Sequence, residues 1–395
     1  MDGVFNHVTG NEIFPYHFFY RQLQGSTSTI GRGFFDGGSS PYVGPFDGRF
    51  DGLRDLDFNN ACLEEFVRDV CFYWMDEFGI DGIRFDNTVN FFDSRSLSDP
   101  TIPGNGLFNL IANVNTRAAD PNFSTILEHL EFDAALVTNF VNATSYWNNA
   151  LYGVAFDYLY NDGIPPGIMN ALNSKNGLVG GGKVATTYLT NHDHSHLAWQ
   201  AGARTNQGSG LWFRTQPLAI ALMTIPGSPM IQNGQEFAED YWVPEGDIAV
   251  GDNRSGRRVY PRPLRWGFAD DVVGKRLRDV YQTLNRIHEE NPGLRSDNVY
   301  PMNWPEGQTT LDEEGYGVDR ERGLVIYHRY GNDSSGNLQR FIIVLNFSDT
   351  DLTVSVPFSD DGIWRDLLTE ETVNVSGFRA DISVNSNWGR IYLET

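Results

Sequence analysis

Four short segments, each with a carboxylate at or beside the end of an apolar run, recur along the chain in a fixed order. They are DGVFNH at residues 2–7, GIRFD at 82–86, the run 126–128 that ends in Glu128, and NHD at 191–193. The stretches between them show the spacing of amphipathic helices. Alternating strands and helices form parallel sheets, in which the carboxyl ends of the strands meet at one edge. The pattern therefore predicts an α/β barrel with acidic groups gathered at one end.

The first helix is marked by an apolar stripe that includes Leu63, Val67 and Val70, and Gly79 is a natural stop. This spacing predicts a helix over residues 59–78 and a strand directly after it, over residues 80–85. The same reasoning predicts helices at 107–117, 134–147, 211–223 and 272–290, and strands at 124–127, 185–189 and 228–232.

Two other stretches break the alternation of strand and helix. Residues 10–52, approximately, are rich in Gly, Ser, Asp and aromatic side chains, and such long loops are usually functional. From about residue 294 the pattern changes to short β-like runs separated by turn residues. These runs are residues 323–328, 341–346, 352–356 and 389–393. They predict a small all-β domain at the C-terminus.

The charge of the chain excludes some partners. A formal net charge of −22 argues against nucleic acid or an anionic membrane, because both need a basic surface. No run of 18 apolar residues exists that would span a bilayer.

Only Lys175, Lys183 and Lys275 are lysines among the 29 basic residues. An acid-rich, lysine-poor surface is typical of adaptation to high salt, and a merely acidic enzyme is the alternative.

Asp86 ends the strand-like run at 80–85, two residues after Arg84. Residues two apart in a strand lie on the same face, so Arg84 would keep Asp86 ionised and orient it. A carboxylate nucleophile needs such a neighbour. The alternative interpretation of this pair is a purely structural ion pair.

Glu128 ends the apolar run at 124–127. A carboxyl group at the mouth of an apolar strand can have its pKa raised by desolvation, which suits a general acid. Glu131, three residues later, is the rival for this role. Two carboxyl groups, one a nucleophile and one an acid/base, are what glycoside hydrolysis with retention requires.

The run at 191–193 adds a third carboxylate, Asp193, which could hold sugar hydroxyls and stabilise a positively charged transition state. His192 would donate to the same hydroxyls. The nearby His194 and His196 suggest a metal site as an alternative, but they lack a companion cysteine. At the end of the first strand, His7 could reach a substrate from the opposite side, whereas a hydrogen-bonded core residue is the alternative.

Taken in order, these segments, together with LRDLD at residues 53–57, resemble the sequence regions of the α-amylase family of retaining glycoside hydrolases. The resemblance covers nearly the whole chain and includes the Gly234–Glu236 segment. It implies an α/β fold, a (β/α)8 TIM-type barrel with an excursion and a C-terminal all-β sandwich domain. The expected domains are a catalytic barrel over residues 1–293, with the loop-rich excursion at about 10–52, and a β-sandwich over residues 294–395.

The resemblance also implies roles for the matching residues. Asp86 would be the nucleophile, Glu128 the acid/base and Asp193 the transition-state stabiliser. The residues that line the subsite for the attacked sugar would be His7, Arg84 and His192.

Family members often bind calcium where the excursion meets the barrel. Asn6 and Asp57 match ligand positions there, and oxygen ligands are those that Ca²⁺ prefers. The resemblance therefore implies a structural calcium ion and no organic cofactor.

Three departures from the family pattern qualify these expectations. The first two strands of the family have no counterpart, so we expect an N-terminally truncated barrel of six units whose activity as an isolated chain is uncertain. Asn90 stands where many α-amylases carry a histidine, and the run 89–91 looks more like relatives that cut small oligosaccharides or α-1,6 bonds. The segment before Glu128 also lacks the usual glycine.

The sequence therefore predicts a hydrolase of α-glucosidic bonds in starch, maltooligosaccharides or related glucans. The alternatives are a hydrolase like cyclomaltodextrinase, neopullulanase or oligo-1,6-glucosidase, a glucan transglycosylase, and an inactive carbohydrate-binding fragment. We expect a glucan substrate, no nucleic acid or membrane partner, and a monomer, with a dimer as the alternative. The sequence assigns no cellular compartment.

Overall fold

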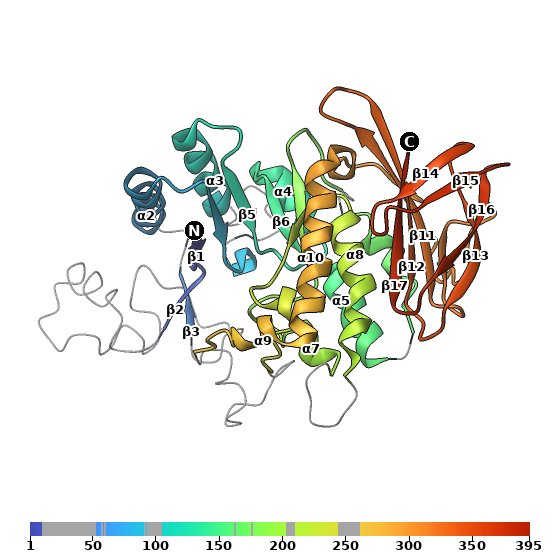
Figure 1. The fold of residues 1–395 in the computed structure, drawn as a ribbon. Coiled ribbons are helices and arrows are strands. Elements are labelled where there is room, and N and C mark those ends of the chain that lie inside the picture. The colour runs from blue at the N-terminus through green and yellow to red at the C-terminus, as the bar shows by residue number, and fades with distance from the viewer. Residues whose placement is uncertain are drawn as a thin grey trace, which may run out of the picture. The chain divides into compact units, whose positions relative to one another are not determined.

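The computed structural model describes residues 1–9, 53–56, 58, 61–90, 92, 105–161, 163–174, 177–202, 210–243 and 261–395. The expected excursion at about residues 10–52 lies outside these ranges. The chain divides into two compact units, and Figure 1 labels many of their elements. Unit 1 is Met1–Trp147 with Gly177–Val184, and unit 2 is Asn148–Asn176 with Ala185–Thr395. Among the described residues, no helix has both the length and the apolar character needed to cross a membrane.

Unit 1 alternates strands and helices, as the sequence predicts. Its elements are β1 (Asp2–Gly3), β2 (His7–Thr9), β3 (Leu53–Asp55), α2 (Ala61–Phe78), β4 (Gly82–Phe85), the 3₁₀ turn η1 (Thr88–Asn90), α3 (Asn105–Ala118), β5 (Ser124–Leu127), α4 (Ala134–Val141) and β6 (Ser145–Asn148).

The main sheet of unit 1 is parallel. β1 pairs with β4, β4 with β5, and β5 with β6, all in parallel register. The last residues of β4 and β5, Phe85 and Leu127, are direct partners across the sheet. Asp86 and Glu128, the residues that follow them, therefore lie next to each other at the same edge of the sheet. A separate antiparallel pair joins β2 to β3.

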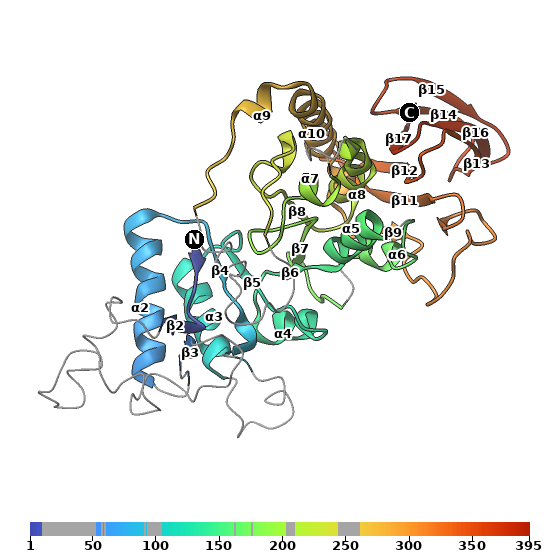
Figure 2. The ribbon, with the colours of Figure 1, turned by 90° about the horizontal axis from the view of Figure 1, so that it is seen from below.

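Helix α2 confirms the predicted helix but only part of its apolar stripe, because Val70 is half-buried and the later aromatic residues Tyr73 and Trp74 are exposed. Leu63, Val67 and Cys71, which are four residues apart, are its buried side chains. The helix ends at Phe78, and Gly79, which follows it, has a φ of +58° and donates its N–H to the carbonyl of Met75. Glycine suits this left-handed position because it has no Cβ to clash. α2 packs against α3 (Figure 2).

The helix predicted over residues 134–147 is wrong in its second half. α4 ends at Val141, and Asn142 adopts a left-handed conformation with φ of 58° that turns the chain. Thr144 then exchanges hydrogen bonds with Thr125 of β5, its N–H donating to the carbonyl oxygen at 3.0 Å and to Oγ1 at 3.1 Å. These bonds start β6, whose SYWN sequence is rich in aromatic side chains.

Unit 2 begins with helices and short strands and ends in a β domain. Its elements are α5 (Ala150–Tyr160), α6 (Ile168–Ala171), β7 (Val184–Tyr188, from Ala185 onward), α7 (Leu197–Gln200), η3 (Leu211–Thr215), α8 (Gln216–Thr224), β8 (Ser228–Met230), η4 (Gln235–Phe237), α9 (Gly267–Asp270), α10 (Val272–Glu290), η6 (Pro292–Arg295), β9 (Val299–Tyr300), β10 (Gly317–Asp319), β11 (Leu324–Asn332), β12 (Leu338–Asn346), β13 (Leu352–Pro357), β14 (Gly362–Asp366), β15 (Thr372–Val375), β16 (Arg379–Val384) and β17 (Trp388–Glu394).

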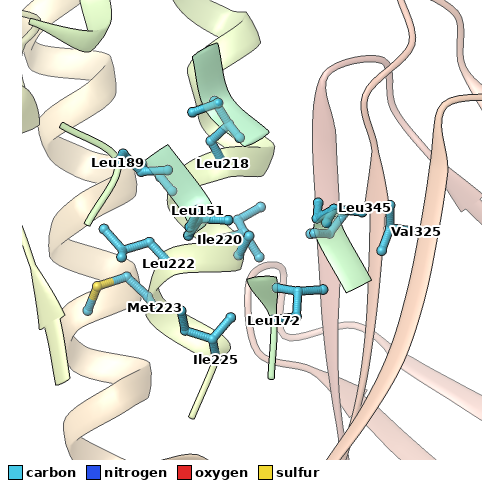
Figure 3. Packing of buried hydrophobic residues seen from close by; sticks show 14 of the residues in the cluster. Leu151, Leu172, Leu189, Leu218, Ile220, Leu222, Met223, Ile225, Val325 and Leu345 are labelled. Carbon is cyan, nitrogen blue, oxygen red and sulfur yellow. The ribbon is translucent and has the colours of Figure 1, made fainter. Parts of the chain in front are cut away.

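Helix α8 lies at the centre of the core of unit 2. Its residues from Pro217 to Thr224 are all buried, so it is covered on every side. α8 contacts α10 on one side and β12 and β17 on the other. Figure 3 shows Ile220 of α8 among apolar side chains that include Leu345 of β12. A helix that is apolar all round is expected only in such a position.

The β domain is a sandwich of antiparallel sheets. One sheet has the order β10-β11-β12-β17-β14-β15, and the other pairs β13 with β16. Alternate residues of β11 and β12 face two different cores. Val325 and Ile343 pack with the helices, whereas Ile326 and Val344 pack with β13 and β16. The C-terminal β-sandwich is thus confirmed, while the predicted domain boundary at residues 293/294 stays a prediction.

One buried arginine ties the helices of unit 2 to the β domain. Arg329 of β11 is fully buried. Its Nε donates to the carbonyl of Asn298 at 2.7 Å, and its Nη2 donates to those of Leu294 and Ser296 at 2.8 and 2.6 Å. Its Nη1 donates to the carbonyl of Thr224, the last residue of α8. The guanidinium group therefore satisfies four main-chain acceptors.

Candidate active site

The carboxyl ends of β4 and β5 hold the two expected carboxylates at one edge of unit 1. The N–H of Asp86 donates to the carbonyl of Gly3 at 3.0 Å, and the N–H of Glu128 donates to that of Phe85 at 2.9 Å. The main-chain pairing of the sheet thus continues one residue beyond the strands. Because residue i and i+2 of a strand face the same side, Arg84 and Asp86 project together.

Arg84 bridges three carboxylates. Its Nη1 lies 2.6 Å from Asp2 Oδ1 and 2.7 Å from Asp86 Oδ1. Its Nη2 lies 2.6 Å from Glu128 Oε2. Burial alone would lower the pKa of Arg84, but the charges of Glu128, Asp2 and Asp86 outweigh it and raise that pKa. The guanidinium group therefore stays charged and connects Asp86 to Glu128.

Trp147, in β6, covers the guanidinium group of Arg84. The Cζ atom of Arg84 lies 4.1 Å from the centre of the Trp147 ring, within the range of a cation–π contact. Both side chains are buried. Trp147 was not predicted as a site residue, because residues 134–147 were expected to form one helix. Asp2 was not predicted either, although it lies in the first strand, in register with Arg84.

Glu128 is held from a second direction by the turn after β4. The N–H of Asn87 donates to Glu128 Oε2 at 2.8 Å. The side chain of Glu128 is 7% exposed, whereas the rival Glu131 is exposed. Of the two candidates, only Glu128 is joined to Asp86 through Arg84 in the described part of the chain. Its placement at this strand end agrees with the sequence analysis.

His7 and Asn6 lie at the end of the first strand. Burial lowers the pKa of His7, and the negative charge of Asp86 acts in the opposite direction, so the imidazole lies within electrostatic reach of that carboxylate. Asn6 is buried, and neither its Oδ1 nor its Nδ2 has a hydrogen-bond partner among the described residues. An unpaired buried amide oxygen fits a calcium ligand. Asp57, the other expected ligand, lies outside the described residues.

The third expected carboxylate belongs to unit 2, after β7. Asn191 is buried, and its Oδ1 accepts the N–H of Asp193 at 2.9 Å. This local turn presents His192 and Asp193 to solvent, with side chains 50% and 41% exposed and 3.8 Å between Nε2 and Oδ2. The structure thus brings Arg84, Asp86, Glu128 and His7 together in unit 1, and His192 and Asp193 in unit 2. That both sets share one pocket stays a prediction.

The two histidines that suggested a metal site lie in different surroundings. His194 stacks on Tyr152 with ring centres 3.9 Å apart. Burial lowers the pKa of His196 to about 4. Within the ranges that the structure describes, no group of three or more His, Cys, Asp or Glu residues is placed to hold a metal ion.

Parallel strands alternating with helices, a C-terminal β-sandwich and two bridged carboxylates at the strand ends define a protein of the (β/α)-barrel class with a candidate glycosidase site. The family model for the α-amylase catalytic domain matches residues 46–310. The chain therefore belongs to the α-amylase family.

Solved structures share this fold over almost the entire chain. The α-amylase from Geobacillus thermoleovorans, complexed with acarbose, aligns with a TM-score of 0.67 and 17% identity, covering 99% of this chain and 76% of that one. A cyclomaltodextrinase aligns with a TM-score of 0.69 and 17% identity, covering 100% of this chain and 60% of that one. These matches agree with a TIM-type barrel followed by a β domain.

A curated relative matches a shorter part of the chain. The 1,4-alpha-glucan branching enzyme GlgB of Nocardia farcinica (strain IFM 10152) is 26% identical over 121 residues. The match covers 30% of this chain and 14% of that protein. The chain therefore spans only a small part of the length of this relative.

Proposed function

We propose that the protein hydrolyses α-glucosidic bonds in starch, maltooligosaccharides or related α-glucans with retention of the anomeric configuration. The observation that carries this proposal is the bridge that Arg84 makes between Asp86 and Glu128. One guanidinium group holds two carboxylates on neighbouring strands, close enough to flank one glycosidic bond. Family membership supports the same reaction class.

The proposed reaction is a double displacement. Asp86 attacks the anomeric carbon while Glu128 gives its proton to the leaving glycosidic oxygen, so that a glycosyl ester forms and the glycosidic bond breaks. Glu128, now a carboxylate, then takes a proton from water. The water oxygen attacks the anomeric carbon, releases Asp86 and restores the protonated Glu128. Arg84 would keep Asp86 ionised for the first step.

The remaining residues of the site would act on the sugar. Asp193 would stabilise the positive charge of the transition state, and His7, Arg84 and His192 would hold the hydroxyls of the attacked sugar. The acarbose complex of the Geobacillus α-amylase supports an oligosaccharide as the ligand of this fold. The side chains of His192 and Asp193 are 50% and 41% exposed, which agrees with such contacts.

The test combines substitutions with product stereochemistry. Asp86→Asn and Glu128→Gln should abolish the hydrolysis of maltooligosaccharides. Asp76→Asn is the matched control, because Asp76 forms an exposed ion pair with Arg117 far along α2. Proton NMR of the first products of the unsubstituted protein should show the α anomer. Release of the β anomer, or full activity of Asp86→Asn, would contradict the proposal.

Transfer to another glucan is the second candidate, because the curated relative is a branching enzyme. In a transglycosylase, a sugar hydroxyl replaces water in the second step. Chromatography of products from maltotetraose distinguishes the two reactions, since products longer than the substrate arise only by transfer. Binding of acarbose without any turnover would instead indicate an inactive carbohydrate-binding protein.

We also propose that a structural calcium ion is held by Asn6 and Asp57. The unpaired amide oxygen of buried Asn6 supports this assignment. If it is correct, removal of calcium by EDTA should lower the Tm, and Asn6→Ala should lose most of that response. An identical EDTA response in Asn6→Ala would refute the role of Asn6.

A further inference from the structure

The turn between β4 and α3 holds Glu128 through its main chain. The N–H of Asn87 donates to Glu128 Oε2 at 2.8 Å, and the N–H of Thr88 donates to the carbonyl of Glu128 at 2.9 Å. Asn87 has a φ of +35°, a conformation that residues with a side chain seldom adopt. Such a conformation persists only where the surroundings hold it in place.

A buried chain of hydrogen bonds provides that support. Thr88 Oγ1 lies 3.0 Å from His129 Nδ1 and 3.2 Å from the carbonyl oxygen of Glu128. On the other side of the ring, His129 Nε2 lies 3.2 Å from Asp133 Oδ1. Thr88 and His129 are buried, and Phe92 packs edge-on against the imidazole ring. This chain of hydrogen bonds therefore runs from Asp133, the residue before α4, to the Asn87–Thr88 turn that contacts Glu128.

The protonation of His129 makes this chain continuous. Burial lowers the pKa of His129, while Asp133 and Glu131 act in the opposite direction. A neutral imidazole has one N–H donor and one acceptor nitrogen. The proton belongs on Nε2, where it can be donated to the Asp133 carboxylate, which leaves Nδ1 as an acceptor. The Thr88 hydroxyl group then lies between two acceptors, Nδ1 of His129 and the carbonyl oxygen of Glu128, and both contacts hold the turn against the Glu128 segment.

We propose that Thr88, His129 and Asp133 are positioning residues for Glu128. They hold the Asn87–Thr88 turn so that the Asn87 N–H meets Oε2 of the Glu128 carboxyl group and fixes the position of that group. This inference rests on the proposed function, because it takes Glu128 as the general acid/base. It adds three residues to the site that touch no substrate.

Leaving-group dependence separates this role from a merely structural one. A maltooligosaccharide needs proton donation to its departing oxygen, whereas fluoride leaves from α-maltosyl fluoride without a general acid. The value of kcat/KM reports the steps up to the covalent intermediate. A misplaced acid should therefore lower kcat/KM for maltotetraose and spare kcat/KM for α-maltosyl fluoride. General destabilisation of the site would lower both.

The experiment uses threonine-to-valine substitutions, which remove a hydroxyl group and keep the side-chain shape. In Thr88→Val, kcat/KM for maltotetraose should fall about tenfold or more, and that for α-maltosyl fluoride should change less than about twofold. Thr88→Ser keeps the hydroxyl group and should restore most of the loss. Thr138→Val is the matched control, because Thr138 is also buried and donates to the carbonyl of Ala134 within α4.

A second variant guards against a folding defect in Thr88→Val. Asp133→Ala removes the far end of the chain, and the Asp133 side chain makes no capping hydrogen bond to α4. It should show the same selective loss of kcat/KM on maltotetraose, with kcat/KM for α-maltosyl fluoride spared. Equal losses on both substrates, or the same effect in Thr138→Val, would overturn the inference alone. An unsubstituted protein that turns over neither substrate would refute the proposed function, and this inference with it.

Discussion

Replacing Arg329 by methionine tests how strongly one buried guanidinium group holds unit 2 together. The substitution would leave four main-chain carbonyls without this donor, those of Thr224 and Leu294, which are buried, and those of Ser296 and Asn298, which are half-buried. Each orphaned acceptor costs about 1 kcal/mol or more. Part of this loss of stability is offset, because the substitution removes the cost of burying the charge of Arg329. That cost is indicated by the pKa of Arg329, which burial lowers to about 10. We expect a net loss of about 3 kcal/mol in the free energy of unfolding.

The assay is urea unfolding of the full chain, followed by tryptophan fluorescence and read as a shift of the midpoint at constant slope. The matched control is Arg322→Met, because Arg322 forms a partly exposed ion pair with Asp319 and should change the stability by less than about 0.5 kcal/mol. A loss below about 1 kcal/mol for Arg329→Met, or one no larger than the control, would refute the reasoning from unsatisfied acceptors.

Three further predictions concern Arg84, His196 and the net charge of the protein. Arg84→Met should lower kcat on maltooligosaccharides about a hundredfold or more, since both bridged carboxylates lose their common partner, whereas Arg117→Met on the surface should leave kcat unchanged. Burial lowers the pKa of His196 to about 4, so between pH 6.5 and 4 the unfolded state binds the proton more tightly than the folded state does. The free energy of unfolding should therefore fall by up to about 3 kcal/mol as the pH falls through that window. His196→Asn should flatten this part of a urea-derived stability profile, and an unchanged slope would argue against the assignment. With a net charge of −22, the Tm should rise with KCl concentration as self-repulsion is screened, and a Tm that falls or stays constant would exclude salt adaptation.

The sequence alone was sufficient to predict the pairing of Arg84 with Asp86. Two residues of one strand share a face whatever the rest of the fold does, so local spacing determines this contact. The contact of Arg84 with Glu128 could not be derived in this way. It depends on the register of β4 against β5, which is set by pairing between segments more than 40 residues apart in the chain. Only the family resemblance placed the two carboxylates in one site.

Trp147 shows where reasoning from hydrophobic spacing fails. The apolar residues of 134–147 fit a helix over their whole length, and the helix does form as far as Val141. The left-handed Asn142 and the threonine contacts across to β5 then redirect the chain into a strand. These are tertiary contacts, which override local propensity. His129 was missed for a related reason, because a single histidine beside Glu128 gives no sign of its partners Thr88 and Asp133.

Because β11 and β12 are buried on both faces, the β domain cannot be removed or exchanged without exposing the helices of unit 2. Their alternate side chains belong to the helix core and to the sandwich core at once. A protein shortened to end at residue 293 would lack β12 and β17 and would expose the apolar side chains of α8, a helix that has no polar face. The C-terminal strands are therefore not an interchangeable module that evolution or an engineer could swap freely. They complete the hydrophobic interior on which the preceding helices depend.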